Sequence, residues 1–386
     1  MNIIILGSGR MGRAIAYDLC KYSNFDRIAI ADKDKKTLQS TKKSLSGKGI
    51  GIHTLDVEKT NDVKDNFQQY DIAISAVPYK FNYNLAKIAV ETRTHFLDLG
   101  GNNEIVEKEL SLFKDAVKNE VTIIPDCGLA PGLTSIITRD IVEQMDSVKY
   151  VKLRVGGLPV NPKPPLNYQI IFSLHGLLNE YVEDAIILDH GRIIKKKSLR
   201  EVETIKFPHP FGEMEAFLTS GGCSTLPYTY KEKISYLDYK TVRYPGHCEK
   251  FKILLDLGFT GETKIKIGGQ NIVPREVLIT LLAKNLQANK EDVVLLKVLS
   301  EGTKGRKKIN LEYTMIDYYD RDNNITAMMR TTGYPTSVIA QMIERETIKK
   351  KGVFPPEKIA PCAPFFEELK KRDIVINKKY DEIKKW

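Results

Sequence analysis

The chain has 386 residues, of which 42% are hydrophobic and 28% charged, which is typical of a globular protein long enough for two domains. Its formal net charge is +10, but the lysines are spread along the chain with few aromatic residues between them, which argues against nucleic-acid binding. No apolar run approaches the roughly 20 residues of a membrane-spanning helix, and the first run begins without the flanks of a signal peptide, so we expect a cytoplasmic protein with no membrane partner.

Residues 2–19 predict a strand, a glycine turn and a helix in immediate succession. The apolar run Asn2–Leu6 is typical of a parallel strand buried on both faces. In the G-x-G-x-x-G turn that follows, Gly7 permits the bend, Gly9 lets the backbone approach a pyrophosphate and Gly12 allows the helix to pack closely on the strand. The residues predicted to bind a dinucleotide here are Gly7, Gly9, Arg10, Met11 and Gly12.

The second predicted strand, residues 27–32, ends in Asp32. An acid at this position accepts hydrogen bonds from the adenosine ribose hydroxyls and repels a 2′-phosphate. We therefore predict NAD as the cofactor, with NADP less favoured, although Lys33, Lys35 and Lys36 follow closely. The alternative is that Asp32 only caps a loop.

Further strands alternate with helices up to residue 126, which predicts a Rossmann-type doubly wound parallel sheet over residues 1–130. Ligands of such sheets bind at the carboxyl ends of the strands. The further residues that this places beside the cofactor are Asp56, Val57, Ala76, Val77 and Pro78.

A sharp corner, IIPDCGLAPGLTS, closes this domain at residues 123–135. Asp126 ends the sixth predicted strand, as Asp98 ends the fifth, so we expect both carboxyls at the ligand edge of the sheet. We predict that they bind a substrate amine or relay its proton, the alternative being that they cap loops. No histidine neighbour for Cys127 is assured, so a nucleophilic role for this thiol is not favoured.

Residues 131–330 predict a second α/β domain with a largely antiparallel sheet. It includes a helix over residues 167–185, a hairpin that turns at Asp189, His190 and Gly191, and an alternating meander over residues 293–330. Residues 331–386 predict helices that return to the first domain. We expect a homo-oligomer, a dimer or tetramer, with the meander offering a face for pairing. Five scattered cysteines without zinc-ligand spacing predict no metal site.

An ordered set of motifs now resembles the saccharopine dehydrogenase family, in its glutamate-forming reductase branch, and most closely its L-lysine 6-dehydrogenases. The motifs span essentially the whole chain and read ILGSGRMG, SAVP, FLDLGGN, PDCGLAPGL, LRVGGLP, FSLHGLLNEY, GGCSTL, TVRYPGH and TTGYPTSVIAQMI.

The resemblance implies an enzyme that oxidises a C–N bond of a small amino-acid substrate with NAD(P). In a lysine 6-dehydrogenase, hydride leaves the ε-carbon, and hydrolysis of the imine gives a 6-semialdehyde that cyclises to piperideine-6-carboxylate while ammonia is released. The alternatives on the same fold are a saccharopine reductase and a carboxynorspermidine-type reductase. The non-enzymatic alternative is an NAD-sensing regulator.

Carried onto this sequence, the resemblance implies Asp98, Asp126 and His175 as catalytic candidates, with His175 as the candidate general base. Saccharopine reductases carry an arginine near the His175 position, and this departure favours a substrate with a single carboxylate, such as lysine. Arg243 is expected to clamp a carboxylate. The candidates for substrate binding are Cys127, Tyr168, Ser224, Thr225, Arg243 and His247.

Overall fold

The computed structural model describes residues 1–45, 49–286 and 291–383. The chain forms two compact units, each built from separate stretches of sequence. Unit 1 comprises Met1–Asp140 and Met329–Ile374, and unit 2 comprises Ile141–Met328 and Val375–Trp386. No helix in the described ranges combines the length and the apolarity that crossing a bilayer requires.

Unit 1 contains a seven-stranded parallel sheet in the order β17-β6-β5-β4-β1-β2-β3, which confirms the predicted doubly wound fold. The central strand β1 is a run of isoleucines buried on both faces, as parallel strands between helical layers require. The strands are β1 (Asn2–Leu6), β2 (Arg27–Asp32), β3 (Gly51–Thr54), β4 (Ile72–Ser75), β5 (His95–Asp98), β6 (Thr122–Ile124) and β17 (Gly352–Val353).

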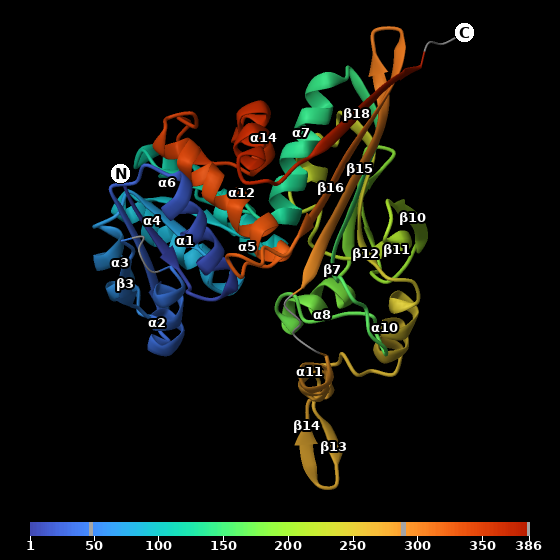
Figure 1. The fold of residues 1–386 in the computed structure, drawn as a ribbon, viewed down its shortest axis with the longest axis horizontal. Coiled ribbons are helices and arrows are strands. Elements are labelled where there is room, and N and C mark those ends of the chain that lie inside the picture. Colours follow the sequence, from blue (N-terminus) through green and yellow to red (C-terminus); the bar gives the residue numbers. More distant parts are fainter. Residues whose placement is uncertain (46–48, 287–290, 384–386) are drawn as a thin grey trace. The chain divides into compact units, whose positions relative to one another are not determined.

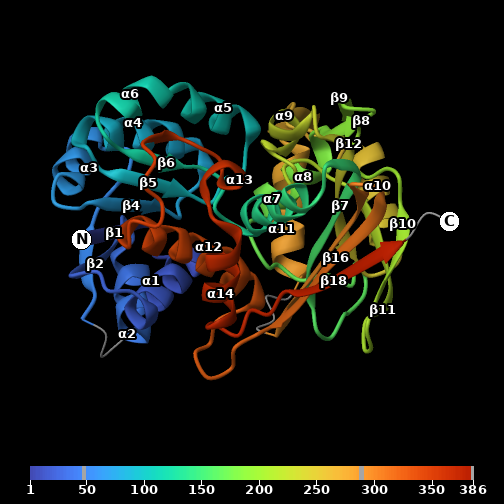
Figure 2. The ribbon, with the colours of Figure 1, turned by 90° about the horizontal axis from the view of Figure 1, so that it is seen from above.

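Helices cover both faces of this sheet (Figures 1 and 2). The helices from the first stretch are α1 (Arg10–Tyr22), α2 (Lys35–Ser44), α3 (Thr60–Phe67), α4 (Asn82–Thr92), α5 (Asn103–Ser111) and α6 (Phe113–Lys118), with the 3₁₀ turn η1 (Tyr79–Phe81). The later helices are α12 (Ala327–Glu344), α13 (Pro356–Ile359) and α14 (Cys362–Lys370), of which α12 enters unit 1 at Met329.

Buried polar contacts join α14 and α12 to α1, which lies beside them in Figure 2. Asp18 on α1 accepts a bond from Arg372 Nε at 2.7 Å, and both side chains are fully buried. Asp18 also accepts bonds from Ser337 Oγ at 2.6 Å and Gln341 Nε2 at 3.2 Å on α12. Arg372 is further paired with Glu368 at 2.8 Å.

Unit 2 is built on a nine-stranded mixed sheet in which only β12 and β7 pair in parallel among the described strands, as the largely antiparallel prediction requires. The predicted hairpin at residues 189–191 joins β8 and β9. The strands are β7 (Ser147–Pro159), β8 (Ala185–Asp189), β9 (Arg192–Lys196), β10 (Glu203–Phe207), β11 (Gly212–Leu218), β12 (Ile234–Arg243), β15 (Asp292–Lys304), β16 (Lys307–Tyr318) and β18 (Asn377–Ile383).

The predicted meander consists of β15 and β16, and the chain's last strand, β18, pairs along the far side of β16. The hydrogen-bonding edge of this hairpin is therefore occupied within the chain itself.

One predicted helix begins later than expected. The helix predicted over residues 167–185 starts only at Leu174, because the Ser173 hydroxyl caps it by accepting a bond from Gly176 N at 3.4 Å. Before α7 the chain passes through an irregular turn, η2 (Leu129–Leu133), which contains Pro131 and where Gly132 has φ of +124°. The helices of unit 2 are α7 (Thr134–Gln144, entering from unit 1), α8 (Leu174–Val182), α9 (Leu226–Tyr230), α10 (His247–Asp256) and α11 (Pro274–Asn285), with the small hairpin β13 (Ile265–Ile267) and β14 (Gln270–Ile272).

Candidate cofactor and substrate sites

The glycine turn after β1 has the backbone that a dinucleotide pyrophosphate requires. A Cβ on Gly7, whose φ is +97°, would lie 2.7 Å from the Ala76 carbonyl oxygen, and one on Gly12 would lie 1.8 Å from the Gly7 carbonyl oxygen. A Cβ on Gly9 would meet no atom within 4 Å, so this residue faces open space. Gly9 is the N-cap of α1 and supplies no capping side chain, which leaves the helix N-terminus to an anion. The turn fits a bound nucleotide.

Asp32 connects the end of β2 to this turn. Its Oδ2 accepts bonds from Ser8 N at 2.7 Å and Ser8 Oγ at 2.9 Å, and its Oδ1 accepts one from Asp34 N at 2.9 Å. The carboxylate is therefore held beside the phosphate turn, where a ribose would lie in a Rossmann domain.

The other predicted cofactor residues follow the strands on either side of β1 and β2. Ala76 N donates to Leu6 O at 2.7 Å, which places Ala76, Val77 and Pro78 against the glycine turn. Asp56 and Val57 lie in the connection from β3 to α3, and Arg10 and Met11 form the first turn of α1. The structure thus gathers these residues at one edge of the sheet, and their contact with a nucleotide stays a prediction.

Asp98 and Asp126 meet at the corner that closes the first stretch of unit 1. Asp98 Oδ1 accepts bonds from Gly100 N at 2.6 Å and Asp126 N at 3.3 Å, and its main-chain oxygen accepts one from Cys127 N at 2.8 Å. A Cβ on Gly100 would lie 2.0 Å from Asp126 Oδ1, so Asp126 folds over this glycine. The two predicted acids are therefore neighbours, and both are buried.

A third carboxyl, that of Glu109 on α5, shares this corner and was missed by the sequence reasoning. Burial raises the pKa of Asp98 to about 6. Burial and the neighbouring Asp98 raise the pKa of Glu109 well above its usual range, so Glu109 keeps its proton at neutral pH. Its position three residues after buried Val106, on the core side of a helix, was the signal in the sequence.

Cys127 does not have the surroundings of a nucleophile. Its Sγ lies 3.2 Å from the Ile124 carbonyl oxygen, and it is fully buried. Burial raises the pKa of the thiol, which keeps it protonated.

Three predicted substrate residues of unit 2 form one buried cluster, namely Tyr168, Arg243 and His247. Arg243 Nε donates to the Tyr181 hydroxyl at 3.1 Å, and its guanidinium carbon lies 5.0 Å from the centre of the Tyr168 ring. The Tyr181 hydroxyl lies 3.0 Å from His247 Nε2. We call Tyr168, Tyr181, Arg243 and His247 the arginine cluster.

The hydrogen bonds of the arginine cluster determine the state of His247. Its Nδ1 lies 3.0 Å from the Leu166 carbonyl oxygen, which can only accept, so Nδ1 carries the proton and Nε2 accepts from Tyr181. Burial and the nearby Arg243 lower the pKa of His247 to about 3. His247 is therefore neutral and holds Tyr181, which in turn holds Arg243.

Arg243 is a buried cation, and the neighbouring acid Glu180 on α8 interacts with it electrostatically without forming an ion pair. The Arg243 side chain is only 2% exposed, and within the described ranges no carboxylate lies at ion-pair distance from its guanidinium. Buried charges in proteins are normally paired, so this arginine suits an anionic ligand.

The remaining predicted residues do not join the arginine cluster. His175 is exposed on α8, and its main-chain oxygen accepts a bond from Arg275 Nη2 at 3.1 Å. Ser224 and Thr225 are buried where α9 begins, after Gly222, whose added Cβ would lie 2.2 Å from the Tyr239 ring. Their roles stay predictions.

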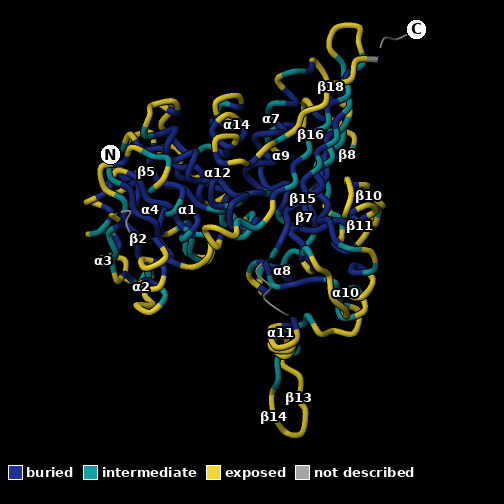
Figure 3. Tube along the Cα trace, viewed as in Figure 1, coloured by how far each residue is buried: buried dark blue, intermediate teal, exposed yellow. Residues whose placement is uncertain are grey.

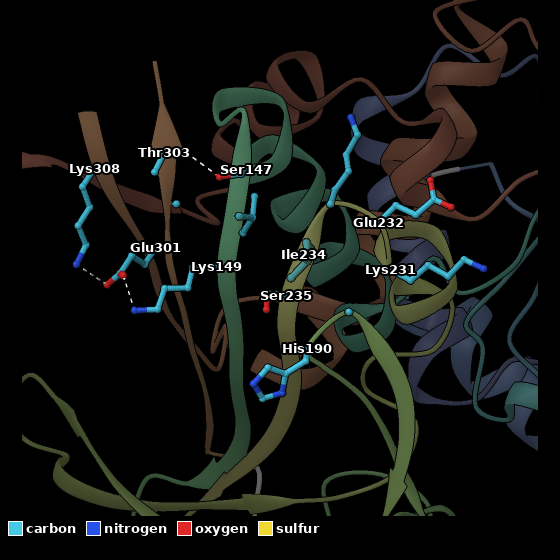
Figure 4. A pocket seen from close by; sticks show the side chains of 14 residues that line it. Ser147, Lys149, His190, Lys231, Glu232, Ile234, Ser235, Glu301, Thr303 and Lys308 are labelled. Atoms are coloured by element: carbon cyan, nitrogen blue, oxygen red, sulfur yellow. Dashed lines mark hydrogen bonds and ion pairs between the residues drawn. The ribbon is translucent and has the colours of Figure 1, made fainter. Parts of the chain in front are cut away.

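A surface hollow of about 540 Å³ in unit 2 lies among β7, β12, β15 and the turn after β8 (Figure 4). On its wall Glu301 accepts bonds from Lys149 Nζ at 2.9 Å and Lys308 Nζ at 3.0 Å. None of the predicted site residues lines it. A smaller cavity of about 90 Å³ is lined partly by Tyr168 and Gln169 and so borders the arginine cluster.

Comparison with known families matches both parts of the chain. Residues 3–124 match the saccharopine dehydrogenase NADP binding domain, and residues 128–375 match the saccharopine dehydrogenase C-terminal domain.

Individual relatives are distant in sequence. The chain is 23% identical to the saccharopine dehydrogenase (NADP+, L-glutamate-forming) of Saccharomyces cerevisiae over 76% of this chain and 66% of that protein, just under two thirds of its length. It is 22% identical to the enzyme of the same name from Schizosaccharomyces pombe over 97% of each. It is also 22% identical to the mitochondrial alpha-aminoadipic semialdehyde synthase of Mus musculus, where it spans 47% of that protein.

Solved structures show the same fold. The apo L-glutamate-forming saccharopine dehydrogenase of S. cerevisiae has a TM-score of 0.79 at 20% identity, with 98% of this chain and 99% of that chain covered. The homospermidine synthase of Legionella pneumophila has a TM-score of 0.67 at 14% identity, with 98% and 91% covered.

Proposed function

Because the chain belongs to the saccharopine dehydrogenase family, we propose that it oxidises or forms the secondary amine of a carboxylated amino acid with a pyridine nucleotide, as a glutamate-forming saccharopine dehydrogenase. The relatives named above support this activity more than the lysine ε-dehydrogenase that His175 and Asp32 suggest. Lysine oxidation is the second candidate, because an exposed histidine occupies the position where a reductase arginine is expected.

The observation that carries the proposal is the buried guanidinium of Arg243, which bonds to Tyr181 but has no carboxylate at ion-pair distance within the described ranges. A guanidinium binds a carboxylate through two parallel hydrogen bonds, and a buried one does so at greater strength than one in water. Tyr181 and His247 fix its orientation before a substrate arrives, so little rotamer entropy is lost on binding. The proposed substrate therefore presents a carboxylate to Arg243.

The residues proposed to hold the nucleotide are those of the glycine turn, with the pyrophosphate at the N-terminus of α1 and the ribose beside Asp32. When bound, the nucleotide supplies or accepts the hydride. Asp32 supports NAD as the preferred form, whereas the named relatives use NADP, so we propose NAD from the residue alone.

The acids of unit 1 are proposed to move the proton that the reaction exchanges. His247 is unsuited to this task, because it is neutral and both ring nitrogens are engaged. Asp98 titrates near the operating range, with its pKa raised to about 6, and it lies next to Asp126 at the ligand edge of the sheet. We propose that these two carboxyls accept or return the amine proton.

The experiment is a substrate screen with the purified chain. Saccharopine, lysine and the reverse pair of glutamate and aminoadipate semialdehyde are each tested with NAD and NADP, and reduced nicotinamide is followed by its absorbance. We expect turnover of saccharopine with release of glutamate. Turnover of lysine with release of ammonia, without turnover of saccharopine, would replace the proposal with the second candidate. Nucleotide binding without turnover of any of these would favour a regulator.

A pair of variants tests the role of Arg243. Arg243→Gln should raise KM for the carboxylated substrate by about 10- to 100-fold, since a hydrogen bond to a charged group contributes about 1.5–3 kcal/mol. The affinity for the nucleotide should not change. Arg192→Gln, at an exposed arginine of the same unit, is the matched control. An unchanged KM for Arg243→Gln would remove the carboxylate role.

A further inference from the structure

The last turn of α8 places a carboxylate beside the arginine cluster. Glu180 directly precedes Tyr181, which holds Arg243, and its main-chain oxygen accepts a bond from Ser220 N at 2.9 Å. Buried residues are interspersed with more accessible ones along α8 (Figure 3), and Glu180 is of intermediate burial. The backbone at Glu180 is therefore fixed, while its side chain remains accessible to a ligand.

The side chains next to Glu180 have partners, whereas its own carboxylate has none. Tyr181 bonds to the arginine cluster, and Glu183 accepts a bond from Ser220 Oγ at 3.3 Å. Within the described ranges the Glu180 carboxylate accepts no hydrogen bond, and only burial, Arg243 and Glu183 act on its pKa. Burial is the largest of these effects and raises the pKa of Glu180 to about 7. A desolvated carboxylate of this kind suits a cationic partner.

Arg243 also keeps hydrogen-bonding capacity for a ligand. Its Nε donates to the Tyr181 hydroxyl at 3.1 Å, and its Nη1 donates to the Val242 carbonyl oxygen at 2.9 Å. Its Nη2 donates to no residue in the part of the chain that the structure describes. Glu180 and Arg243 thus act on each other electrostatically, but neither satisfies the other through an ion pair.

The two charges belong to one site. Tyr239 and Arg243 lie four residues apart on β12, so their side chains point to the same face of the sheet. Glu180 acts electrostatically on both of them and on Tyr168, whose ring lies against the Arg243 guanidinium. These shared neighbours indicate that the Glu180 carboxylate lies over the same face of β12 as the guanidinium.

We propose that Glu180 and Arg243 together bind the head group of an α-amino acid, with Arg243 taking its carboxylate and Glu180 its ammonium. This inference rests on the proposed function for the role of Arg243 and adds the residue that recognises the second charge. Saccharopine and lysine both carry such a head group at the end of the molecule that does not react. The assignment of Glu180 is therefore the same for either candidate substrate.

Ligands with a single charge fit this pair of residues less well. A simple carboxylate would pair with Arg243 but bring a like charge towards Glu180, and a simple amine would pair with Glu180 but face the guanidinium. An α-amino acid carries both charges on one carbon, in the order complementary to the two residues. The arriving ammonium also lowers the pKa of Glu180 and so keeps its carboxylate ionised at neutral pH.

Two ligands that differ only in the ammonium test the proposal without turnover. L-Norleucine and hexanoate share the same carbon chain and carboxylate, and titration calorimetry measures the affinity of the purified chain for each. We expect the wild type to bind norleucine about 10- to 100-fold more tightly than hexanoate, because a hydrogen bond between charged groups is among the strong ones.

Variants assign this preference to individual side chains. Glu180→Gln should weaken norleucine binding by about 10- to 100-fold and leave hexanoate binding at least as tight, which also shows that the variant is folded. Arg243→Gln should weaken the binding of both ligands. Glu183→Gln is the matched control, because it removes the same charge three residues further along, at an exposed position, and should leave both affinities unchanged.

The outcomes separate this inference from the proposed function. A wild-type chain that does not prefer norleucine, or binds neither ligand, would overturn the inference even if saccharopine is turned over. A preference that survives Glu180→Gln, or one that is lost equally in Glu183→Gln, would remove the role of Glu180. A preference lost in Glu180→Gln alone would support the pair even in a chain that turns over neither saccharopine nor lysine.

Discussion

Glu109 illustrates how a buried acid can be fixed in its neutral form by its neighbours. Its carboxyl has no exposed surface, and neither it nor Asp98 forms an ion pair with a basic side chain within the described ranges. Two adjacent carboxyls without a cation share a proton more readily than they ionise together. The proton on Glu109 therefore allows Asp98 to stay close to the backbone amides of Gly100 and Asp126.

The neutral carboxyl of Glu109 predicts a contribution that lowers the free energy of unfolding as the pH rises. One substitution, Glu109→Gln, should remove this contribution. The unfolded chain ionises Glu109 near the ordinary glutamate pKa of 4.5, but the folded chain keeps the proton, so folding takes up a proton above that pH and stability is lost as pH rises. Glu109→Gln does not titrate, and from about pH 5 to about pH 8 it should gain up to about 1.4 kcal/mol per pH unit over the wild type. Urea unfolding at several pH values in this range measures the difference in free energy of unfolding between the variant and the wild type. Glu107→Gln, at an exposed glutamate of the same helix, is the control. A difference that does not vary with pH would contradict the neutral carboxyl.

Asp32 makes a second residue-scale prediction. Asp32→Asn keeps the size of the side chain but removes the charge that repels a 2′-phosphate, so it should lower the preference for NAD over NADP by about 10- to 100-fold. The measurement is kcat/KM with both nucleotides. Asp34→Asn changes the neighbouring acid that caps α2 and should leave the ratio unaffected. An unchanged ratio for Asp32→Asn would mean that the acid serves only to hold Ser8.

At the scale of elements, the C-terminal helices are held in unit 1 by charge as well as by apolar packing. Arg372 follows α14 and forms fully buried contact with Asp18 on α1. Its neighbour Lys371 pairs with the same Glu368 but is 63% exposed. Lys371 and Arg372 thus share Glu368 as a partner, and the chief difference between them is that Arg372 is buried and Lys371 is exposed.

That contrast provides a matched test of α14 docking. Arg372→Met should lower the free energy of unfolding by about 3–5 kcal/mol, because it leaves Asp18 as an uncompensated buried charge. Lys371→Met should lower it by less than about 1 kcal/mol, as exposed ion pairs contribute little. Chemical denaturation of both variants measures the difference. Equal, small losses would show that α14 is held by packing alone.

At the scale of the whole molecule, stretches that are far apart in the sequence belong to the same compact unit. Unit 1 combines the first 140 residues with residues 329–374, so its cofactor edge and its C-terminal helices belong to one compact body. Ligand binding stabilises the whole body that folds around it, by about 2.7 kcal/mol at a concentration of 100 times Kd.

Hydrogen exchange in the presence of NAD tests whether residues 329–374 and the glycine turn belong to one cooperative unit. We expect slower exchange not only at β1 and α1 but also at residues 329–374, which lie more than 300 residues away from the glycine turn. Residues 185–243 of unit 2, including β8 to β12, serve as the internal comparison and should change less. Protection confined to the first stretch would contradict a single cooperative unit.

The sequence predicted those features that local patterns determine. The glycine turn, the parallel strands and the hairpin at residues 189–191 each follow from a few adjacent residues, and the structure confirms the fold. Local reasoning failed where distant contacts decide. Leu174 begins a helix only because Ser173 caps it, and Glu109 is unusual only because Asp98, on another element, lies beside it.

The candidate site was harder to predict than the fold for the same physical reason. Arg243, Tyr181 and His247 come from β12, α8 and α10, and no spacing in the sequence predicts that one tyrosine hydroxyl joins an arginine to a histidine. The motif identified Arg243 and His247 as candidates, whereas the neutral state of His247 depends on burial that only the fold provides.

The interrupted composition of unit 1 also affects the order in which the nascent chain can fold. Residues 141–328 separate its two stretches, and at about 5–20 residues per second a ribosome needs roughly ten to forty seconds to synthesise them. During that interval β6 lacks β17, the edge strand that later pairs with it. By the time β17 is synthesised, nearly all of unit 2 has emerged. We therefore expect the first stretch of unit 1 to stay incomplete until nearly all of unit 2 has been synthesised, and to depend most on chaperones during that interval.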